Sequence, residues 1–360
     1  MADLPDILKA SVSKGASDIQ IVPGKPPMVR IHGEMHPLSE VPPISAEEAK
    51  RMIFSVLYED QRSRFETDWE LDTSLSVPNV SRFRVNVYQQ RKGIGAAFRA
   101  IPSKIPAPNE IGLMPSVVRL AELPRGLVLV TGPTGSGKST TLASLIETIN
   151  LSQHKTILTI EDPIEFVYED KSSVILQREV GQQTKSFAEA LRRAMRQNPD
   201  VILVGEMRDL ETIQLAITAA ETGHLCFATL HTQDAPTSVD RVIDVFPPHQ
   251  QQQVRVQVST VLRAVVSQVL LPRKGGQGRV ASREVMTVTP AVANLIREGK
   301  IHQLYGAIEA GSKFGMISMD QHLAFLIKQD LIDLDVAMAK AHDPQTLKGL
   351  LAMAGSGEKP

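Results

Sequence analysis

The feature that most constrains the fold is the segment 132–139, Gly-Pro-Thr-Gly-Ser-Gly-Lys-Ser, which matches the phosphate-binding loop pattern G-x-x-x-x-G-K-[ST] in full. Its glycines let the backbone curl so that successive N–H groups point inward and cradle phosphate oxygens. Lys138 is expected to reach the β- and γ-phosphates, and the Ser139 hydroxyl to coordinate Mg²⁺. The sequence therefore predicts that the chain binds a nucleoside triphosphate. The predicted binding residues are Gly132, Pro133, Thr134, Gly135, Ser136, Gly137, Lys138, Ser139 and Thr140.

The residues on either side of the loop predict the strand and the helix that it needs. Residues 127–131 form a short apolar run that is typical of a buried parallel strand. After the loop, Leu142, Leu145, Ile146 and Ile149 recur at i, i+3, i+4 and i+7, the spacing of one helix face. The N-terminus of such a helix favours anions, so this context supports a phosphate site over a chance Gly/Ser turn.

Composition narrows the class of protein. A chain of 360 residues is longer than a typical single domain, so we expect two domains. The net charge of −1 and the aromatic content of 4% argue against a nucleic-acid partner. The single cysteine, Cys226, excludes an internal disulfide and a multi-cysteine zinc site, and it fits a reducing cytosol. The N-terminus lacks a signal-peptide core and no apolar stretch approaches ~20 residues, so we expect membrane association only through a partner.

The first hundred residues have the pattern of a small α+β domain. A helix is predicted to begin at the capping box formed by Ser45 and Glu48, and alternating apolar residues mark strands around it. The predicted strands lie at 19–22, 28–31, 82–88 and 94–101. The predicted domains are an α+β domain at 1–101, a proline-rich linker at 102–112, an α/β domain at 113–353 and a disordered tail at 354–360.

From about residue 113, apolar runs alternate with helical stretches, which is typical of a parallel sheet wound by helices. One of these helices is predicted to open with a capping box from Ser186 to Glu189. The predicted strands lie at 127–131, 156–160, 201–205 and 225–230. Helices are predicted at 250–270, 291–298 and 320–342, so we expect the C-terminal end to be mostly α.

Acidic residues follow two of these strands, at the edge where open α/β sheets carry their chemistry. Glu206 follows an apolar strand in the Walker B arrangement, in which a carboxylate holds Mg²⁺ or polarises the attacking water. Glu161, Asp162 and Glu165 follow the strand at 156–160, and each of them is a candidate to take a proton from that water. Their spacing does not rank them.

Histidines and arginines provide further candidates. His231 follows the strand at 225–230 and can contact a γ-phosphate. His224 precedes that strand and can contact the phosphate less directly. Either histidine can instead have a structural role. One hairpin of the N-terminal domain is rich in arginine, which fits a group supplied in trans to a neighbouring site or a solvated basic strand face. These arginines are Arg82, Arg84, Arg91 and Arg99.

Together the motifs resemble the secretion-type ATPases, most closely the PilT-type ATPases that retract type IV pili in twitching motility. The resemblance covers nearly the whole chain. In it, residues 132–139 are the Walker A loop, and 15–18 and 81–86 resemble the N-terminal domain. Residues 157–166 resemble the Asp box, 200–209 the Walker B segment and 219–231 the His box.

The resemblance implies a PAS-like N-terminal domain, a RecA-like P-loop ATPase domain with a helical C-terminal end, and a ring of six subunits with nucleotide sites between the two domains. It implies that ATP hydrolysis with Mg²⁺ drives pilus retraction. In the site it implies Glu165 as general base and Glu206 as Walker B acid. It also implies nucleotide sensing by His231 with His224, and trans-acting arginines. These arginines are Arg84 and Arg99.

The resemblance also implies partners: other copies of the chain, an inner-membrane platform protein of the pilus machinery and a paralogous retraction ATPase, with the chain held at the cytoplasmic face of that membrane.

One segment departs from the pattern. Residues 291–298 read Ala-Val-Ala-Asn-Leu-Ile-Arg-Glu, so Ala293 stands where retraction ATPases carry arginine. In the family this segment is tied to retraction, and we expect ATP hydrolysis to survive the change.

Three alternatives remain at this point. An accessory, PilU-like retraction ATPase fits the same motifs. The pilus-assembly and type II secretion ATPases carry a long N-terminal extension and a four-cysteine zinc site, and this chain has neither feature. A RecA-like nucleic-acid motor is disfavoured by the near-neutral charge and the few aromatic residues.

Overall fold

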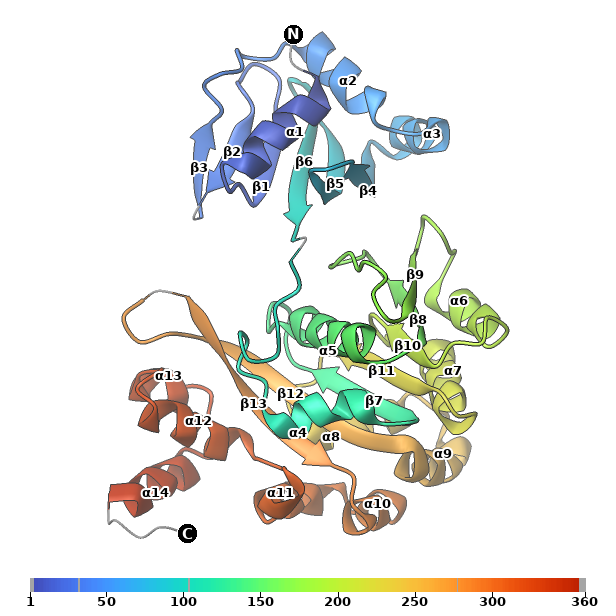
Figure 1. The fold of residues 1–360 in the computed structure, drawn as a ribbon, viewed down its shortest axis with the longest axis vertical. Coiled ribbons are helices and arrows are strands. Elements are labelled where there is room, and N and C mark those ends of the chain that lie inside the picture. Colours follow the sequence, from blue (N-terminus) through green and yellow to red (C-terminus); the bar gives the residue numbers. More distant parts are fainter. Residues whose placement is uncertain (1–2, 32, 103, 277, 356–360) are drawn as a thin grey trace. The chain divides into compact units, whose positions relative to one another are not determined.

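The computed structural model of the chain describes residues 3–31, 33–102, 104–276 and 278–355 and contains two compact units (Figure 1). The first unit consists of residues up to Lys104 together with Glu165–Val167, and the second of Ile105–Ile164 and the residues from Tyr168 onward. Each unit has its own sheet and its own hydrophobic core. The mixed α/β fold expected from the sequence is therefore confirmed.

The first unit is an antiparallel sheet of six strands in the order β3-β2-β1-β6-β5-β4. Its strands are β1 (Asp18–Ile21), β2 (Met28–Ile31), β3 (Glu34–Pro37), β4 (Glu70–Val77), β5 (Ser81–Gln90) and β6 (Gly93–Ile101). Its helices are α1 (Leu4–Ser13), α2 (Ala46–Ser55) and α3 (Glu59–Asp68).

The core of this unit lies between one face of the sheet and the helices. Phe83, Val85 and Val87 of β5 are fully buried, while Arg84 on the opposite face is exposed, as the alternation in the sequence predicts. Helix α2 begins at a complete capping box, in which Ser45 Oγ accepts from the Glu48 N–H and the Glu48 carboxylate accepts from the Ser45 N–H. The predicted start of this helix is confirmed.

The second unit contains a seven-stranded sheet in the order β13-β12-β7-β11-β10-β8-β9. All neighbouring pairs are parallel except β12 and β13, which are antiparallel. The strands are β7 (Gly126–Thr131), β8 (Thr156–Glu161), β9 (Val174–Glu179), β10 (Val201–Val204), β11 (Leu225–Leu230), β12 (Leu262–Pro272) and β13 (Arg279–Thr287). The helices up to β12 are α4 (Pro115–Val118), α5 (Lys138–Ser152), α6 (Phe187–Ala194), α7 (Leu210–Glu221), α8 (Ala235–Asp244) and α9 (Pro248–Val261).

Helices cover both faces of this sheet, so its central strands are apolar throughout. Val128 and Val130 of β7 pack toward α5 and α4, and the alternate residues Leu127 and Leu129 pack toward α6 to α9. Every residue of β7, β10 and β11 is buried. The carboxyl ends of the parallel strands therefore form one edge, at which the polar loops emerge.

The C-terminal part differs from the sequence-based prediction in two places. The helix predicted at 250–270 ends at Val261, and residues 262–272 form β12, which pairs with β7 on one side and with β13 on the other. The apolar run in this segment suits a buried strand as well as a helix, and the tertiary pairing decides between them. The helix predicted at 320–342 is two shorter helices, α12 (Met319–Lys328) and α13 (Leu334–Met338).

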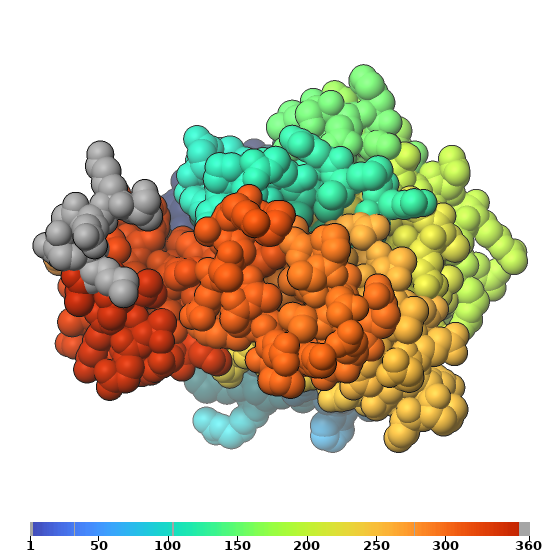
Figure 2. All heavy atoms as spheres, turned by 90° about the horizontal axis from the view of Figure 1, so that it is seen from below, coloured from blue at the N-terminus to red at the C-terminus, as the bar shows by residue number. Residues whose placement is uncertain are grey.

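The remaining C-terminal helices are α10 (Pro290–Arg297), α11 (Leu304–Glu309) and α14 (Pro344–Gly355). Figure 2 shows these helices and α12, in orange to red, on one face of the second unit beside the segment around α4. Gly315 approaches Ser116 closely there, because a Cβ built on the glycine would lie 2.5 Å from the serine Cβ. Residues 356–360 of the predicted tail lie outside the described residues, and Ala354 and Gly355 close α14.

Among the described residues, none of the helices has both the length and the apolar character that crossing a membrane requires.

Candidate nucleotide-binding site

The phosphate-binding loop connects the end of β7 with the start of α5, as the sequence predicts. Gly132, Gly135 and Gly137 have φ values of 140°, 78° and 87°, which L side chains rarely adopt. At Gly132 the space is also closed: a Cβ there would lie 2.2 Å from the Gln268 carbonyl oxygen. The loop conformation thus depends on glycine at these positions.

Lys138 lies inside the curve of the loop. Its Nζ donates to the Gly132 and Pro133 carbonyl oxygens at 2.8 and 3.1 Å, and the residue is 9% exposed. Burial lowers the pKa of Lys138, while the nearby Glu206 carboxylate acts in the opposite direction. The lysine and the candidate Walker B acid are therefore close enough to interact electrostatically.

Glu206 lies two residues past the end of β10, and its carboxylate contacts an arginine and a histidine. Its Oε1 is 3.0 Å from His231 Nε2, and its Oε2 is 2.7 Å from Arg208 Nη2. Burial tends to raise the pKa of Glu206, but Arg208 and His231 outweigh this effect and hold that pKa below its usual value. Glu206 is consequently ionised at neutral pH, as a Mg²⁺ ligand or a water-orienting acid requires. Arg208 was not singled out by the sequence, although its place two residues after Glu206 offered a signal.

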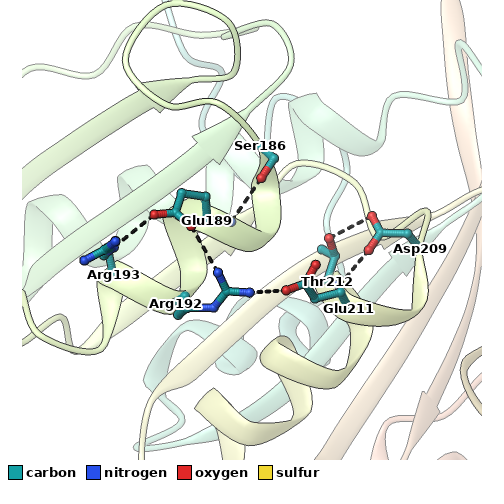
Figure 3. Close-up of polar contacts among 7 residues, drawn as sticks. All are labelled: Ser186, Glu189, Arg192, Arg193, Asp209, Glu211 and Thr212. Atoms are coloured by element: carbon teal, nitrogen blue, oxygen red, sulfur yellow. Dashed lines mark hydrogen bonds and ion pairs between the residues drawn. The ribbon is translucent and has the colours of Figure 1, made fainter.

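Helix α7, which follows the Glu206 segment in the chain, begins at a side-chain cap (Figure 3). Asp209 caps α7, accepting from the N–H and the hydroxyl of Thr212 at 2.9 Å each. Arg192 of α6 bonds to Glu211 in the first turn of α7, so this ion pair joins the two helices.

The predicted capping box at the start of α6 is only half formed. Ser186 Oγ accepts from the Glu189 N–H at 3.1 Å. The Glu189 carboxylate instead accepts from Arg192 and Arg193, at 3.1 and 3.0 Å (Figure 3). Two cations therefore hold the carboxylate that the box would use.

The structure distinguishes the three acids that follow β8. Glu161 is buried and accepts from Thr159 Oγ1 at 2.7 Å and from Gln177 Nε2 at 3.3 Å. Asp162 is exposed. Glu165 belongs to the first unit together with Arg84 and Arg99. Glu165 is also exposed, although partial burial raises the pKa of its carboxyl, and the two arginines partly oppose this rise. A carboxyl whose pKa is raised is better matched to proton abstraction near neutral pH.

His231 and His224 lie at opposite ends of β11. His231 follows the carboxyl end, next to Glu206. His224 precedes the amino end, where its Nδ1 is 2.9 Å from the Ala219 carbonyl oxygen and 3.2 Å from Thr222 Oγ1. A strand of this length separates its ends by about 20 Å. Within one chain, therefore, the structure brings His231 to the loop but not His224.

Arg84 and Arg99 are cross-strand partners on β5 and β6, and both are exposed. Arg99 Nε donates to Asp18 Oδ1 at 2.8 Å. Like charges directly opposite each other on a sheet are unfavourable, and the nearby carboxylates of Asp18 and Glu165 offset this repulsion.

Gln268 of β12 contacts the loop and was missed by sequence reasoning. Its Nε2 donates to the Ser136 carbonyl oxygen at 2.7 Å, and its Oε1 accepts from Thr141 Oγ1 at 2.8 Å. The segment was predicted as helix, so no sequence signal placed this residue at the loop.

The fold and the loop define a P-loop nucleotide-binding protein, with a parallel sheet whose carboxyl edge carries the loop, an acid and a histidine. Comparison with known proteins identifies the family. The family model described as "Type II/IV secretion system protein" matches residues 4–314. The chain belongs to this family, and the expectation of a secretion-type ATPase is confirmed.

Individual relatives match over nearly the full length. The chain is 49% identical over 343 residues to the type IV pilus retraction ATPase PilT of Pseudomonas aeruginosa, covering 95% of this chain and 99% of that protein. It is 51% identical over 321 residues to a twitching motility protein of Neisseria gonorrhoeae, covering 89% of this chain and 86% of the relative. A crystal structure of the pilus retraction motor PilT with bound ADP superposes with a TM-score of 0.91 at 46% identity, covering 97% of this chain and 100% of that one.

Proposed function

We propose that this chain is an ATP-hydrolysing motor that retracts type IV pili and so drives twitching motility. The observation that carries the proposal is the combination of an intact phosphate-binding loop with the ionised Glu206 beside it, in a chain that matches retraction ATPases over nearly its full length. The relative named PilU is 38% identical over 352 residues, so the principal retraction ATPases are the better match.

The residues of the loop fit a nucleotide. Ser136 Oγ is a buried hydroxyl without a hydrogen-bond partner among the described residues, and it lies in the loop whose glycines turn successive N–H groups inward. Lys138 supplies positive charge for the β- and γ-phosphates, since its present acceptors are two loop carbonyls that a phosphate can replace.

The donor set also fits Mg²⁺. Among the described residues, no group of three or more acidic, histidine or cysteine side chains could hold a metal ion. Mg²⁺ bound with a nucleotide needs only one or two protein oxygens besides phosphates and water. The Ser139 hydroxyl and the Glu206 carboxylate would supply these two oxygens. Mg²⁺ neutralises charge that develops on the phosphates when it is bound there.

A cavity of about 310 Å³ in the second unit suits the adenosine part of the nucleotide. Its walls include Gly137 and Thr140 of the loop and first helical turn, so it is continuous with the phosphate cradle. Its lining also includes apolar residues and arginines that can face a ribose hydroxyl or a base edge. Among these lining residues are Leu270, Val280, Phe325, Leu326, Arg273, Arg279 and Arg283.

Five residues then perform the hydrolysis. Glu165 takes the proton from the attacking water, since burial raises the pKa of this carboxyl toward the working range. Glu206 orients the water and the metal, and His231 reports the γ-phosphate to Glu206 through their contact at 3.0 Å. Arg84 and Arg99 of a neighbouring copy stabilise the transition-state charge, as the adjacency of two exposed cations supports.

An arginine supplied in trans requires an assembly, so we propose a homohexamer at the cytoplasmic face of the inner membrane. Its partners are the platform protein of the pilus machinery and a paralogous retraction ATPase. His224 then acts, if it touches nucleotide, in the site of another copy.

The test combines a biochemical and a cellular measurement. Purified chain is expected to hydrolyse ATP with Mg²⁺, without strong stimulation by single-stranded DNA. Deletion of the gene is expected to give hyperpiliated, non-twitching cells. Bald cells would indicate an assembly ATPase, and strong stimulation by DNA would indicate a nucleic-acid motor.

A further inference from the structure

Gln268 contacts the phosphate-binding loop from a strand that lies 130 residues downstream. On β12, Ser267 pairs with Thr131, the last residue of β7, so Gln268 stands at the level where the loop begins. The residue is 2% exposed, and its amide faces the loop from inside the fold. Its neighbour Ser267 bonds to Thr131 Oγ1 at 2.8 Å.

Three contacts join Gln268 to the loop and its helix. The backbone carbonyl closes the space next to Gly132, where a Cβ would lie 2.2 Å from it. The side-chain Nε2 donates to the Ser136 carbonyl at 2.7 Å, and Oε1 accepts from Thr141 of α5 at 2.8 Å. One side chain thus connects the sheet, the loop and the helix.

The bond to the Ser136 carbonyl fixes the direction of the next amide. Ser136 O and the Gly137 N–H belong to one peptide unit, which is planar and trans, so the two groups point in opposite directions. Anchoring the carbonyl on Gln268 therefore turns the Gly137 N–H away from Gln268. Gly137 has φ 87°, which leaves this peptide free to rotate when it is not held.

We propose that Gln268 is a positioning residue of the nucleotide site, which holds the Ser136–Gly137 peptide so that its N–H is presented to the phosphate chain of the nucleotide. The inference rests on the proposed function, because it concerns the phosphates of the same ligand. Gln268 does not touch the reacting atoms, and it acts through the loop backbone. A preformed cradle spares the nucleotide the cost of ordering this peptide.

The test replaces Gln268 with Glu, which keeps the size and the acceptor for Thr141 but puts an oxygen opposite the Ser136 carbonyl. We expect the Kd of ADP, measured by calorimetry, to rise at least about tenfold, since a hydrogen bond to a charged group is lost. Gln268 also lines the cavity that suits adenosine, so the Kd of adenosine, measured by NMR titration, should rise by no more than about threefold, well below the change for ADP. In turnover, KM for ATP should rise by a similar factor while kcat stays within threefold, because the anchored amide binds ground state and transition state alike.

Ser267→Ala is the matched control, since it deletes a buried hydrogen bond of the adjacent residue on the same strand. The thermal midpoint of Ser267→Ala should fall by about as much as that of Gln268→Glu. The affinity of Ser267→Ala for ADP should stay within threefold of that of the parent chain. Equal ADP affinities in the two variants, or a parallel loss of adenosine and ADP in Gln268→Glu, would overturn the proposal and leave Gln268 a structural residue.

Lys138→Ala separates this result from a failure of the proposed function. If the parent chain binds no ADP, or if Lys138→Ala binds it unchanged, the nucleotide site itself is misassigned. If Lys138→Ala weakens ADP as expected while Gln268→Glu does not, only the role of Gln268 is refuted.

Discussion

Replacing Gly132 with Ala tests whether the loop conformation is imposed by β12 as well as by glycine itself. The new Cβ would lie 2.2 Å from the Gln268 carbonyl oxygen, about 1 Å inside ordinary contact, and neither atom can move without moving the backbone that carries it. Relief requires β7 and β12 to separate, although they pair from Leu127 to Thr131. A φ of 140° costs an L residue about 1–3 kcal/mol, and overpacking adds about 1–3 kcal/mol.

We therefore expect Gly132→Ala to destabilise the second unit by about 4 kcal/mol, which lowers its thermal midpoint by about 8–16 °C for a domain of roughly 150–250 residues. The measurement is calorimetry of the full chain without nucleotide, because ligand would add its own stabilisation.

Gly135→Ala is the matched control in the same loop. Its φ is 78°, but a Cβ there meets nothing within 4 Å, so only the backbone term of about 1 kcal/mol applies. The midpoint should then fall by about 2–4 °C. Equal losses in the two variants would refute the reasoning, since they would show that the contact with Gln268 carries no cost.

Further predictions concern three acids. Glu206→Gln should lower kcat at least about 100-fold while the Kd of ADP changes less than about threefold, because the phosphate cradle remains; near-normal phosphate release would rule out the Walker B assignment. Glu165→Gln should retain affinity but show slow single-turnover hydrolysis. In the parent chain that rate should fall as pH drops through the raised pKa of Glu165, and a profile shared with Glu165→Gln would contradict its role as base. Burial raises the pKa of Glu284 from 4.5 to about 7, so the folded state favours the protonated form of this carboxyl. The contribution of protonated Glu284 to the free energy of unfolding is therefore complete below about pH 4.5 and is lost as the pH rises to 7. Glu284→Gln should therefore gain about 3 kcal/mol relative to the parent chain between pH 4.5 and pH 8 in thermal unfolding, and no such gain would contradict the burial of a charged Glu284.

Local patterns in the sequence predicted much of the fold. The alternation of Phe83, Val85 and Val87 predicted β5, and the strands at 127–131, 156–160, 201–205 and 225–230 appear within a residue or two of their predicted bounds. Such signals depend on side chains only a few residues apart, because strand and helix periodicity repeats over that distance. Residues 262–270 were predicted as helix, since this mostly apolar segment has no clear periodicity that separates a buried strand from a buried helix.

The sequence indicated those residues of the candidate site that lie next to a recognisable motif, and it did not indicate the others. Glu206 and His231 follow strand ends, and the parallel sheet brings them within 3.0 Å of each other as the strand pattern implies. His224 is only seven residues from His231, but strand β11 carries the two histidines to opposite edges.

The sequence by itself determined the phosphate-binding loop, because glycine spacing, Lys138 and the flanking strand and helix are local properties of the chain. Only the tertiary structure decided that Gln268 supports this loop. That contact depends on β12 entering the sheet next to β7, and strand order is set by packing among residues far apart in the chain, which no local pattern records.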